Sequence, residues 1–134
     1  MSKTLDHIGI IVNDMDQALA FWRDALGLEL REVEDLPDRG LRVAMIPVGD
    51  ARIELIASTR NDSEIAANLQ KRGPGLHHIC LRSDDVQKDL DQLDAQGLRL
   101  INRQAKAGAG GSKVGFVHPK ASGGVLLELS QTKA

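Results

Sequence analysis

Aromatic residues, cysteine and long apolar stretches are all scarce in this chain. Its 134 residues include one Trp, two Phe and no Tyr, so aliphatic side chains must build the core and no tyrosine can serve as an acid. The single cysteine, Cys80, excludes an internal disulfide and is typical of a reducing compartment. The N-terminus has no apolar region of a signal peptide, and no apolar run approaches the roughly 20 residues of a membrane span. We therefore expect a cytoplasmic protein with no membrane partner.

A strong charge of either sign is also lacking. The 17 basic and 19 acidic residues leave a net charge of −2, which provides no general attraction for nucleic acid. Hydrophobic residues make up 42% and charged residues 27% of the chain, as in an ordinary globular protein. The length suits one compact domain, over residues 1–134.

The chain repeats itself, and the repeat includes two histidines. Residues 6–30 can be laid over residues 77–101 with a shift of 71 positions, which places His7 on His78. Each copy reads as a strand, an acidic helix start, an amphipathic helix, a glycine and a further strand. Polar residues rarely recur inside apolar strands without a reason, so the matched histidines indicate a shared role.

Two glutamates match in the same way further along the chain. Residues 42–58 resemble residues 113–131, and Glu54 meets Glu128 after a hairpin that is three residues longer in the second copy. Each half therefore reads β-α-β-β-β. We expect an α+β fold with two tandem βαβββ modules that form a curved, half-barrel mixed sheet around a metal cleft. The expected bounds are about 4–60 and 76–131 for the modules, and 61–75 for a helical connector.

The helices have recognisable ends. A glycine, Gly27 or Gly97, marks the end of each module's helix. Short polar side chains that accept from the first free backbone N–H groups precede the helices. The expected caps are Asn13 or Asp14, Asp62 or Ser63, and Ser83 or Asp84, and the expected apolar stripe of the first helix is Ala18, Leu19, Trp22 and Leu26.

Side chains alternate between the two faces of a strand, which decides where the matched residues point. His7 shares a face with Ile11, Glu54 shares one with Ile56, and Glu128 lies opposite to an apolar face of Val125, Leu127 and Leu129. We expect the apolar faces to pack on the helices. The other faces then carry His7, Glu54, His78 and Glu128.

Four such side chains suit a divalent metal. Two carboxylates buried near each other need a compensating cation, and two imidazoles with two carboxylates carry a total charge of −2. Mixed nitrogen and oxygen ligands with room for two more fit octahedral Mn²⁺, Co²⁺, Ni²⁺ or Fe²⁺, and Zn²⁺ accepts them too. Two open positions allow a substrate to chelate through two oxygens.

Four segments carry a resemblance to a known family. They are "LDHIGIIVNDMDQALAFWRDALGLEL", "RVAMIPVGDARIELI", "KRGPGLHHICLRSDDV" and "KVGFVHPKASGGVLLELS". With these the chain resembles the vicinal oxygen chelate superfamily, in which two βαβββ modules form a metal-holding half-barrel, and within it the methylmalonyl-CoA epimerases. The resemblance implies an isomerase of propionate metabolism that interconverts (R)- and (S)-methylmalonyl-CoA through an enolate. It also implies a homodimer and a divalent metal, with Co²⁺ first, held by His7, Glu54, His78 and Glu128.

The resemblance has two departures, and both concern acidic residues. Some relatives have Gln where this chain has Glu54, which remains a competent ligand. Some also place a catalytic glutamate where "PDRGLRVAM" has Val43, and valine cannot move a proton. We therefore expect one or both of Glu54 and Glu128, on opposite sides of the site, to double as metal ligand and as acid or base at C2 of the substrate, with a metal-bound water as a further candidate.

An acyl-CoA thioester requires cationic contacts for its phosphates. Lys106, Lys113 and Lys120 flank or follow the "AGAGGS" stretch at 107–112, whose backbone amides can approach a phosphate. His118, in "VHPK", matches the family pattern. These four are the substrate-binding candidates, and a solvated loop or a turn-stabilising role is the alternative for each of them.

The adjacent histidines at 77 and 78 have different expected roles. His78 aligns with His7 and is the expected ligand, whereas His77 takes the place of Asp6, points the other way and is expected to be either structural or a neighbour that contacts a ligand. Cys80 shares a face with His78, and we expect it to be a packed side chain because no base is placed to activate it.

Three alternatives remain open. A glyoxalase I-like isomerase of a glutathione hemithioacetal would use the same ligand types. An extradiol dioxygenase is disfavoured by the fourth ligand and the lack of Tyr. A metal-free small-molecule binding or resistance protein would need no ligand set and favours aromatic surfaces, which this chain lacks.

Overall fold

The computed structural model of the chain describes residues 3–108 and 111–132 and contains two compact units. The first, module 1, runs from His7 to His77, and the second, module 2, comprises the chain up to Asp6 and from His78 onward. Ala109 and Gly110, in the AGAGGS stretch, lie outside the described residues. The β-α-β-β-β order expected from the repeat is confirmed in both copies.

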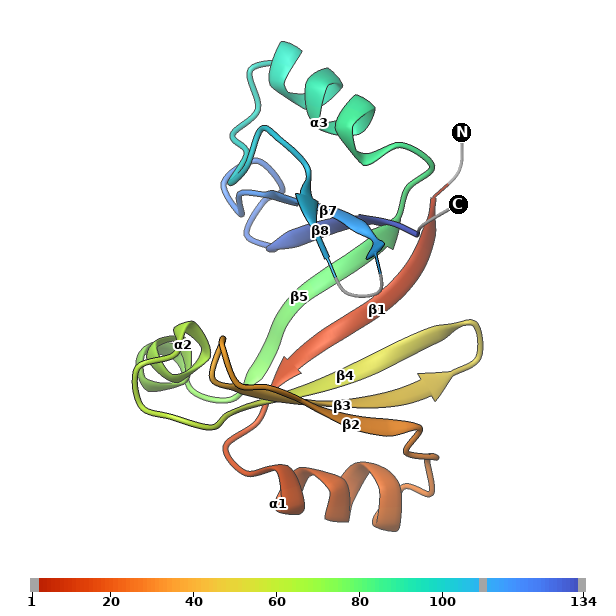
Figure 1. Cartoon of the computed structure of the whole chain (residues 1–134), viewed down its shortest axis with the longest axis vertical. Helices are drawn as coiled ribbons and strands as arrows, with labels where there is room; N and C mark the ends of the chain where they lie inside the picture. The colour runs from red at the N-terminus through yellow and green to blue at the C-terminus, as the bar shows by residue number, and fades with distance from the viewer. Residues whose placement is uncertain (1–2, 109–110, 133–134) are drawn as a thin grey trace. The chain divides into compact units, whose positions relative to one another are not determined.

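The strands of module 1 follow the order β2-β3-β4-β1. β1 pairs with β4 in parallel, and the other neighbours are antiparallel. Figure 1 shows α1 along one side of this sheet. The bounds are β1 (Thr4–Ile11), α1 (Met15–Leu19), η1 (Ala20–Ala25), β2 (Glu32–Leu36), β3 (Leu41–Val48) and β4 (Ala51–Ser58).

The first helix begins at the expected cap and ends before Gly27 as expected, but its last turn is wider than an α-helical turn. The carboxylate of Asp14 accepts from the backbone N–H of Gln17 at 2.9 Å, which confirms Asp14 as the cap. The helix then widens into the π-helix η1, in which the N–H of Leu26 donates to the carbonyl of Phe21 at 2.8 Å. This wider turn breaks the 3.6-residue period, and Leu26 is 53% exposed. Its expected place in the apolar stripe is therefore wrong, and Leu28 packs against the core in addition to Trp22.

Both faces of the module 1 sheet are covered in part by apolar side chains. On one face, Met15 and Leu19 of α1 pack against Ala44, Ile46 and Leu55. The opposite face carries an apolar cluster that includes two side chains from the connector helix, α2 (Glu64–Arg72), whose expected cap Ser63 accepts from the N–H of Ala66 at 2.9 Å. This cluster consists of Ile11, Leu41, Val43, Ile56 and Ile65, with Leu36, Met45 and Leu69 at its margin.

Module 2 has the strand order β5-β8-β7-β6, with β5 parallel to β8. The strand expected directly after Gly97 is reduced to a single bridge between Leu100 and Val117, and β6 has only two residues. The bounds are β5 (Gly75–Arg82), α3 (Val86–Ala95), β6 (Lys106–Ala107), β7 (Lys113–Val117) and β8 (Leu127–Gln131).

Helix α3 begins one residue later than expected. Asp85 caps it by accepting from the N–H of Lys88 at 3.1 Å, so neither Ser83 nor Asp84 is the cap. The hydroxyl of Ser83 instead donates to the buried carboxylate of Asp89. That carboxylate also lies 3.4 Å from the ammonium group of Lys3, which joins the first described residue to α3.

The core of module 2 lies between α3 and one face of its sheet. Val86 and Leu90 of α3 pack against Val117 and Leu129. Val125, expected on this apolar face, precedes β8 and is 42% exposed. No helix among the described residues is long and apolar enough to cross a membrane.

Candidate metal centre

Module 1 buries a histidine and a glutamate against each other on neighbouring strands. The parallel register of β1 and β4 pairs His7 with Arg52 and Gly9 with Glu54, so the His7 and Glu54 side chains project from the same face. Nε2 of His7 lies 2.7 Å from Oε2 of Glu54, and the two side chains are 8% and 13% exposed. The sequence prediction that these residues share a face is confirmed.

Module 2 contains the matching pair. Nε2 of His78 lies 3.2 Å from Oε1 of Glu128, and the side-chain exposures are again 8% and 13%. β5 and β8 supply these residues, in a parallel register that places Cys80 beside Glu128. The duplication read from the sequence thus produces the same strand pairing, the same burial and the same contact twice.

The chemistry of each pair fits metal ligation. A carboxylate that is nearly nine-tenths buried requires a cation or a hydrogen-bond donor as compensation. Each nitrogen of an imidazole either carries an N–H donor or offers a lone pair to a metal ion, and it cannot do both at once. Each pair offers one nitrogen and one oxygen donor, the mixture that suits divalent ions of the first transition row. The donor set within each module therefore fits the expected cofactor class.

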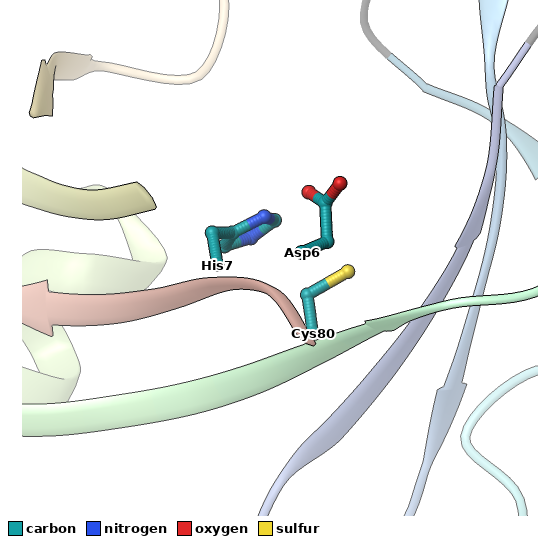
Figure 2. Close-up of side chains that lie close together, drawn as sticks. All are labelled: Asp6, His7 and Cys80. Atoms are coloured by element: carbon teal, nitrogen blue, oxygen red, sulfur yellow. The ribbon is translucent and has the colours of Figure 1, made fainter. Parts of the chain in front are cut away.

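Beside the module 2 pair lies a carboxylate that the sequence analysis did not single out as a site residue. Asp6 is 6% exposed and accepts from Nη2 of Arg82 at 2.7 Å. Figure 2 shows its carboxylate beside the thiol of Cys80, with His7 as the next residue along β1; the ligand atoms of Asp6 and Cys80 lie within 4.8 Å of each other. Cys80 is fully buried, as expected for a packed side chain. The sequence feature that could have pointed to Asp6 is its position directly before the candidate ligand His7 in an apolar strand.

Val43, at the position where some relatives have a catalytic glutamate, has apolar surroundings in the structure. Val43 is 6% exposed, pairs with Ile56 across β3 and β4, and lies in the apolar cluster on the Glu54 face. The residue directly opposite Glu54 is Met45, and the one opposite Glu128 is Phe116. Each glutamate therefore has one large apolar neighbour across the strand pair.

The four substrate-binding candidates separate into two groups. Lys106 and Lys113 lie at the β6–β7 hairpin, where Lys106 pairs with Val114 and Lys113 pairs with Ala107, so their side chains project from opposite faces. His118 and Lys120 lie in the turn beyond the other end of β7. A five-residue strand separates the groups, so all four cannot contact one phosphate group.

Comparisons with known proteins agree with this architecture. The profile of the Glyoxalase/Bleomycin resistance protein/Dioxygenase superfamily matches residues 6–116. The mitochondrial methylmalonyl-CoA epimerase of Mus musculus is 38% identical over 128 residues, which cover 95% of this chain and 72% of that protein. The ethylmalonyl-CoA/methylmalonyl-CoA epimerase of Cereibacter sphaeroides is 38% identical over 133 residues, with coverage of 98% and 99%.

A solved structure is similar throughout. The crystal structure of methylmalonyl-CoA epimerase from Mycobacterium tuberculosis has a TM-score of 0.86 and 39% sequence identity, with coverage of 98% of this chain and 89% of that chain. The chain belongs to the Glyoxalase/Bleomycin resistance protein/Dioxygenase superfamily. The fold class expected from the sequence is confirmed.

Proposed function

We propose that this chain is a methylmalonyl-CoA epimerase, an isomerase that interconverts the (R) and (S) forms of methylmalonyl-CoA. The observation that carries the proposal is the buried His–Glu pair, which recurs at matched positions in both modules. Relatives with this name that are 38% identical over nearly the whole chain support the choice of substrate. The same pair would also serve a glyoxalase I-like isomerase, so the assay below includes that reaction.

In this proposal His7, Glu54, His78 and Glu128 together hold one divalent metal ion. Their total charge of −2 matches such an ion, and mixed nitrogen and oxygen donors suit Co²⁺, which the family resemblance favours, as well as Mn²⁺, Ni²⁺, Zn²⁺ and Fe²⁺. A bound divalent ion supplies Lewis acidity toward the thioester and carboxylate oxygens that flank C2 of the substrate.

Glu54 and Glu128 move the proton at C2. One removes it as a base, and the other returns a proton on the opposite face as an acid. Val43 cannot take part, because its side chain has no titratable group and lies in an apolar cluster. Met45 and Phe116 lie opposite the two glutamates, so each glutamate has an apolar neighbour on the adjacent strand.

Exchange of the C2 proton in D₂O tests the function. The unmodified enzyme is expected to incorporate deuterium into methylmalonyl-CoA and to leave methylglyoxal with glutathione unchanged. Glu54→Gln and Glu128→Gln are each expected to slow the exchange by about 10²–10⁴-fold, the usual contribution of an acid or base. Full exchange in both variants contradicts the roles of the glutamates, and turnover of the hemithioacetal alone contradicts the proposed substrate.

The proposal includes a homodimer in the cytoplasm as the working form. Light scattering after size-exclusion chromatography measures the mass in solution, for which we expect twice the 14.5 kDa of the chain. Cell fractionation tests the location.

A further inference from the structure

A group of basic side chains lies where β7 ends, away from the β6–β7 hairpin. The N–H of His118 donates to the carbonyl of Arg99 at 3.1 Å, directly after the bridge between Leu100 and Val117. Arg99 and His118 are therefore a directly opposed antiparallel pair, and their side chains leave the same face of the sheet. Leu100 and Val117 face the α3 core instead.

Lys120 is tied to the same imidazole. Its backbone N–H donates to Nδ1 of His118 at 3.0 Å, which leaves Nε2 of the neutral ring as the N–H donor. Two further backbone hydrogen bonds close this turn, from Ala121 to His118 at 2.9 Å and from Gly124 to Pro119 at 2.8 Å. The positions of the imidazole and of the Lys120 backbone are thus fixed before any ligand binds.

The group carries positive charge without a local counterion. Among the described residues, neither Arg99 nor Lys120 takes part in an ion pair, whereas the nearby Arg103 lies 3.5 Å from Asp94. The pKa of His118 lies below its ordinary value of 6.5, because of burial first and then because of the positive charges of Arg99 and Lys120. Like charges opposed across a strand pair destabilise the fold, so the arrangement favours a bound anion.

An exposed apolar residue adjoins the charges. The N–H of Ile101 donates to the carbonyl of Phe116 at 2.9 Å, so Ile101 and Phe116 are the next opposed pair on the face that carries Arg99 and His118. Ile101 is 54% exposed. The surface therefore offers cations at one end and an apolar strip beside them, which suits a phosphate group attached to a larger organic molecule.

We propose that Arg99, His118 and Lys120 form a phosphate-binding site in module 2. The site accepts a phosphate through the guanidinium group, the Nε2–H group and the ammonium group. The ligand is a phosphate of the CoA moiety, either the 3′-phosphate or the diphosphate, and this assignment rests on the proposed function. Lys106 and Lys113, at the other end of β7, are not part of it.

Kinetics with three thioesters test the site. The substrates are methylmalonyl-CoA, methylmalonyl-dephospho-CoA and the methylmalonyl thioester of N-acetylcysteamine, which has no phosphate. Arg99→Gln and Lys120→Gln are each expected to raise KM for the CoA thioester about tenfold with kcat unchanged, because each loses a charge-assisted hydrogen bond. KM for the N-acetylcysteamine thioester is expected to stay the same. Arg103→Gln, which removes a nearby surface charge, is the matched control.

The dephospho-CoA thioester identifies the phosphate. If the variants no longer differ from the unmodified protein with this substrate, the ligand is the 3′-phosphate; if the tenfold difference persists, the ligand is the diphosphate. Unchanged KM for the CoA thioester in both variants, or an equal rise with the N-acetylcysteamine thioester, overturns the proposal.

Calorimetric titration with CoA itself separates this inference from the proposed function. Weaker binding of CoA by Arg99→Gln but not by Arg103→Gln supports the site even if the protein exchanges no C2 proton. Exchange of the C2 proton by a protein whose affinity for CoA is unaffected by Arg99→Gln overturns the site and leaves the epimerase function standing.

Discussion

The two modules bury the same His–Glu pair but surround it differently. In module 1, Ile11 on β1 pairs with Ile56 on β4, and both are buried in the apolar cluster that includes Ile65 of α2. The matched positions in module 2 are Arg82 on β5 and Ser130 on β8, which pair in the same register. Arg82 is exposed and donates to Asp6.

This difference indicates which features the two modules share and which features are specific to each module. The strand register and the His–Glu contact are the same in both copies, so they are the part that the proposed metal ligation would require. Glu54 shares its face with apolar side chains, whereas the matched positions of module 2 are the polar residues Arg82 and Ser130, and the basic group at His118 lies beyond the other end of β7. We infer that the His–Glu pairs serve the proposed chemistry in both modules and that module 2 in addition binds polar parts of the substrate.

Removal of either histidine gives the largest expected effect, and it tests what the modules share. His7→Ala and His78→Ala are each expected to abolish stoichiometric metal binding, because each removes a proposed nitrogen ligand. His77→Ala, which changes the adjacent residue on the opposite face, is expected to retain the metal. Metal content after dialysis, measured by mass spectrometry, checks this. Loss of metal in His77→Ala as well would contradict the assignment of His78 alone.

Exchanging the residues near the two His–Glu pairs tests the difference between the modules. Ile56→Ser places a hydroxyl in the apolar cluster of module 1 and is expected to lower the free energy of unfolding by about 2–5 kcal/mol. Ser130→Ile, the reverse change in module 2, is expected to change it by less than about 1 kcal/mol, because the site is only half-buried. Urea unfolding of both variants measures the difference. Equal losses would show that the two faces are packed alike.

The contact between helix and sheet also differs, at a matched pair of small residues. Gly115 on β7 corresponds to the buried Ala44 on β3. A Cβ atom at Gly115 would lie 2.7 Å from Cδ1 of Leu90, a fully buried side chain of α3. Gly115→Ala is therefore expected to cost about 1–3 kcal/mol.

Ala44→Gly is the matched control for this contact. It is expected to cost about 1 kcal/mol, through the lost methyl group and the greater freedom of the unfolded chain. Urea unfolding measures both changes. A Gly115→Ala variant as stable as the unmodified protein would mean that α3 is free to shift on the sheet.

Much of this architecture could be predicted from the sequence because the relevant patterns are local or repeated. Alternation along single strands predicted that His7 and Glu54 share the face opposite to α1. Two features escaped prediction because they depend on non-local geometry. The π-helix moved Leu26 out of the stripe, and nothing in the spacing of its apolar residues indicates a wider turn. Arg99 could not be singled out, because only its pairing with His118 across an isolated bridge gives it a role.

The smallest expected effect concerns the charge on His118, which has no histidine counterpart in module 1. The pKa of His118 in the folded protein lies below 6.5, so as the pH falls the imidazole is protonated in the unfolded chain first. Its contribution to stability is therefore present above pH 6.5 and is lost as the pH falls. Arg99→Gln removes one of the two repelling charges, so it is expected to raise this pKa part of the way toward 6.5, while burial keeps it below. Arg103→Gln is expected to leave it unchanged. Titration of the imidazole by NMR at low salt measures the shift, since salt screens such interactions. Identical titration curves for Arg99→Gln and the unmodified protein would mean that the guanidinium group points away from the imidazole, and the phosphate site would then lose one of its three contacts.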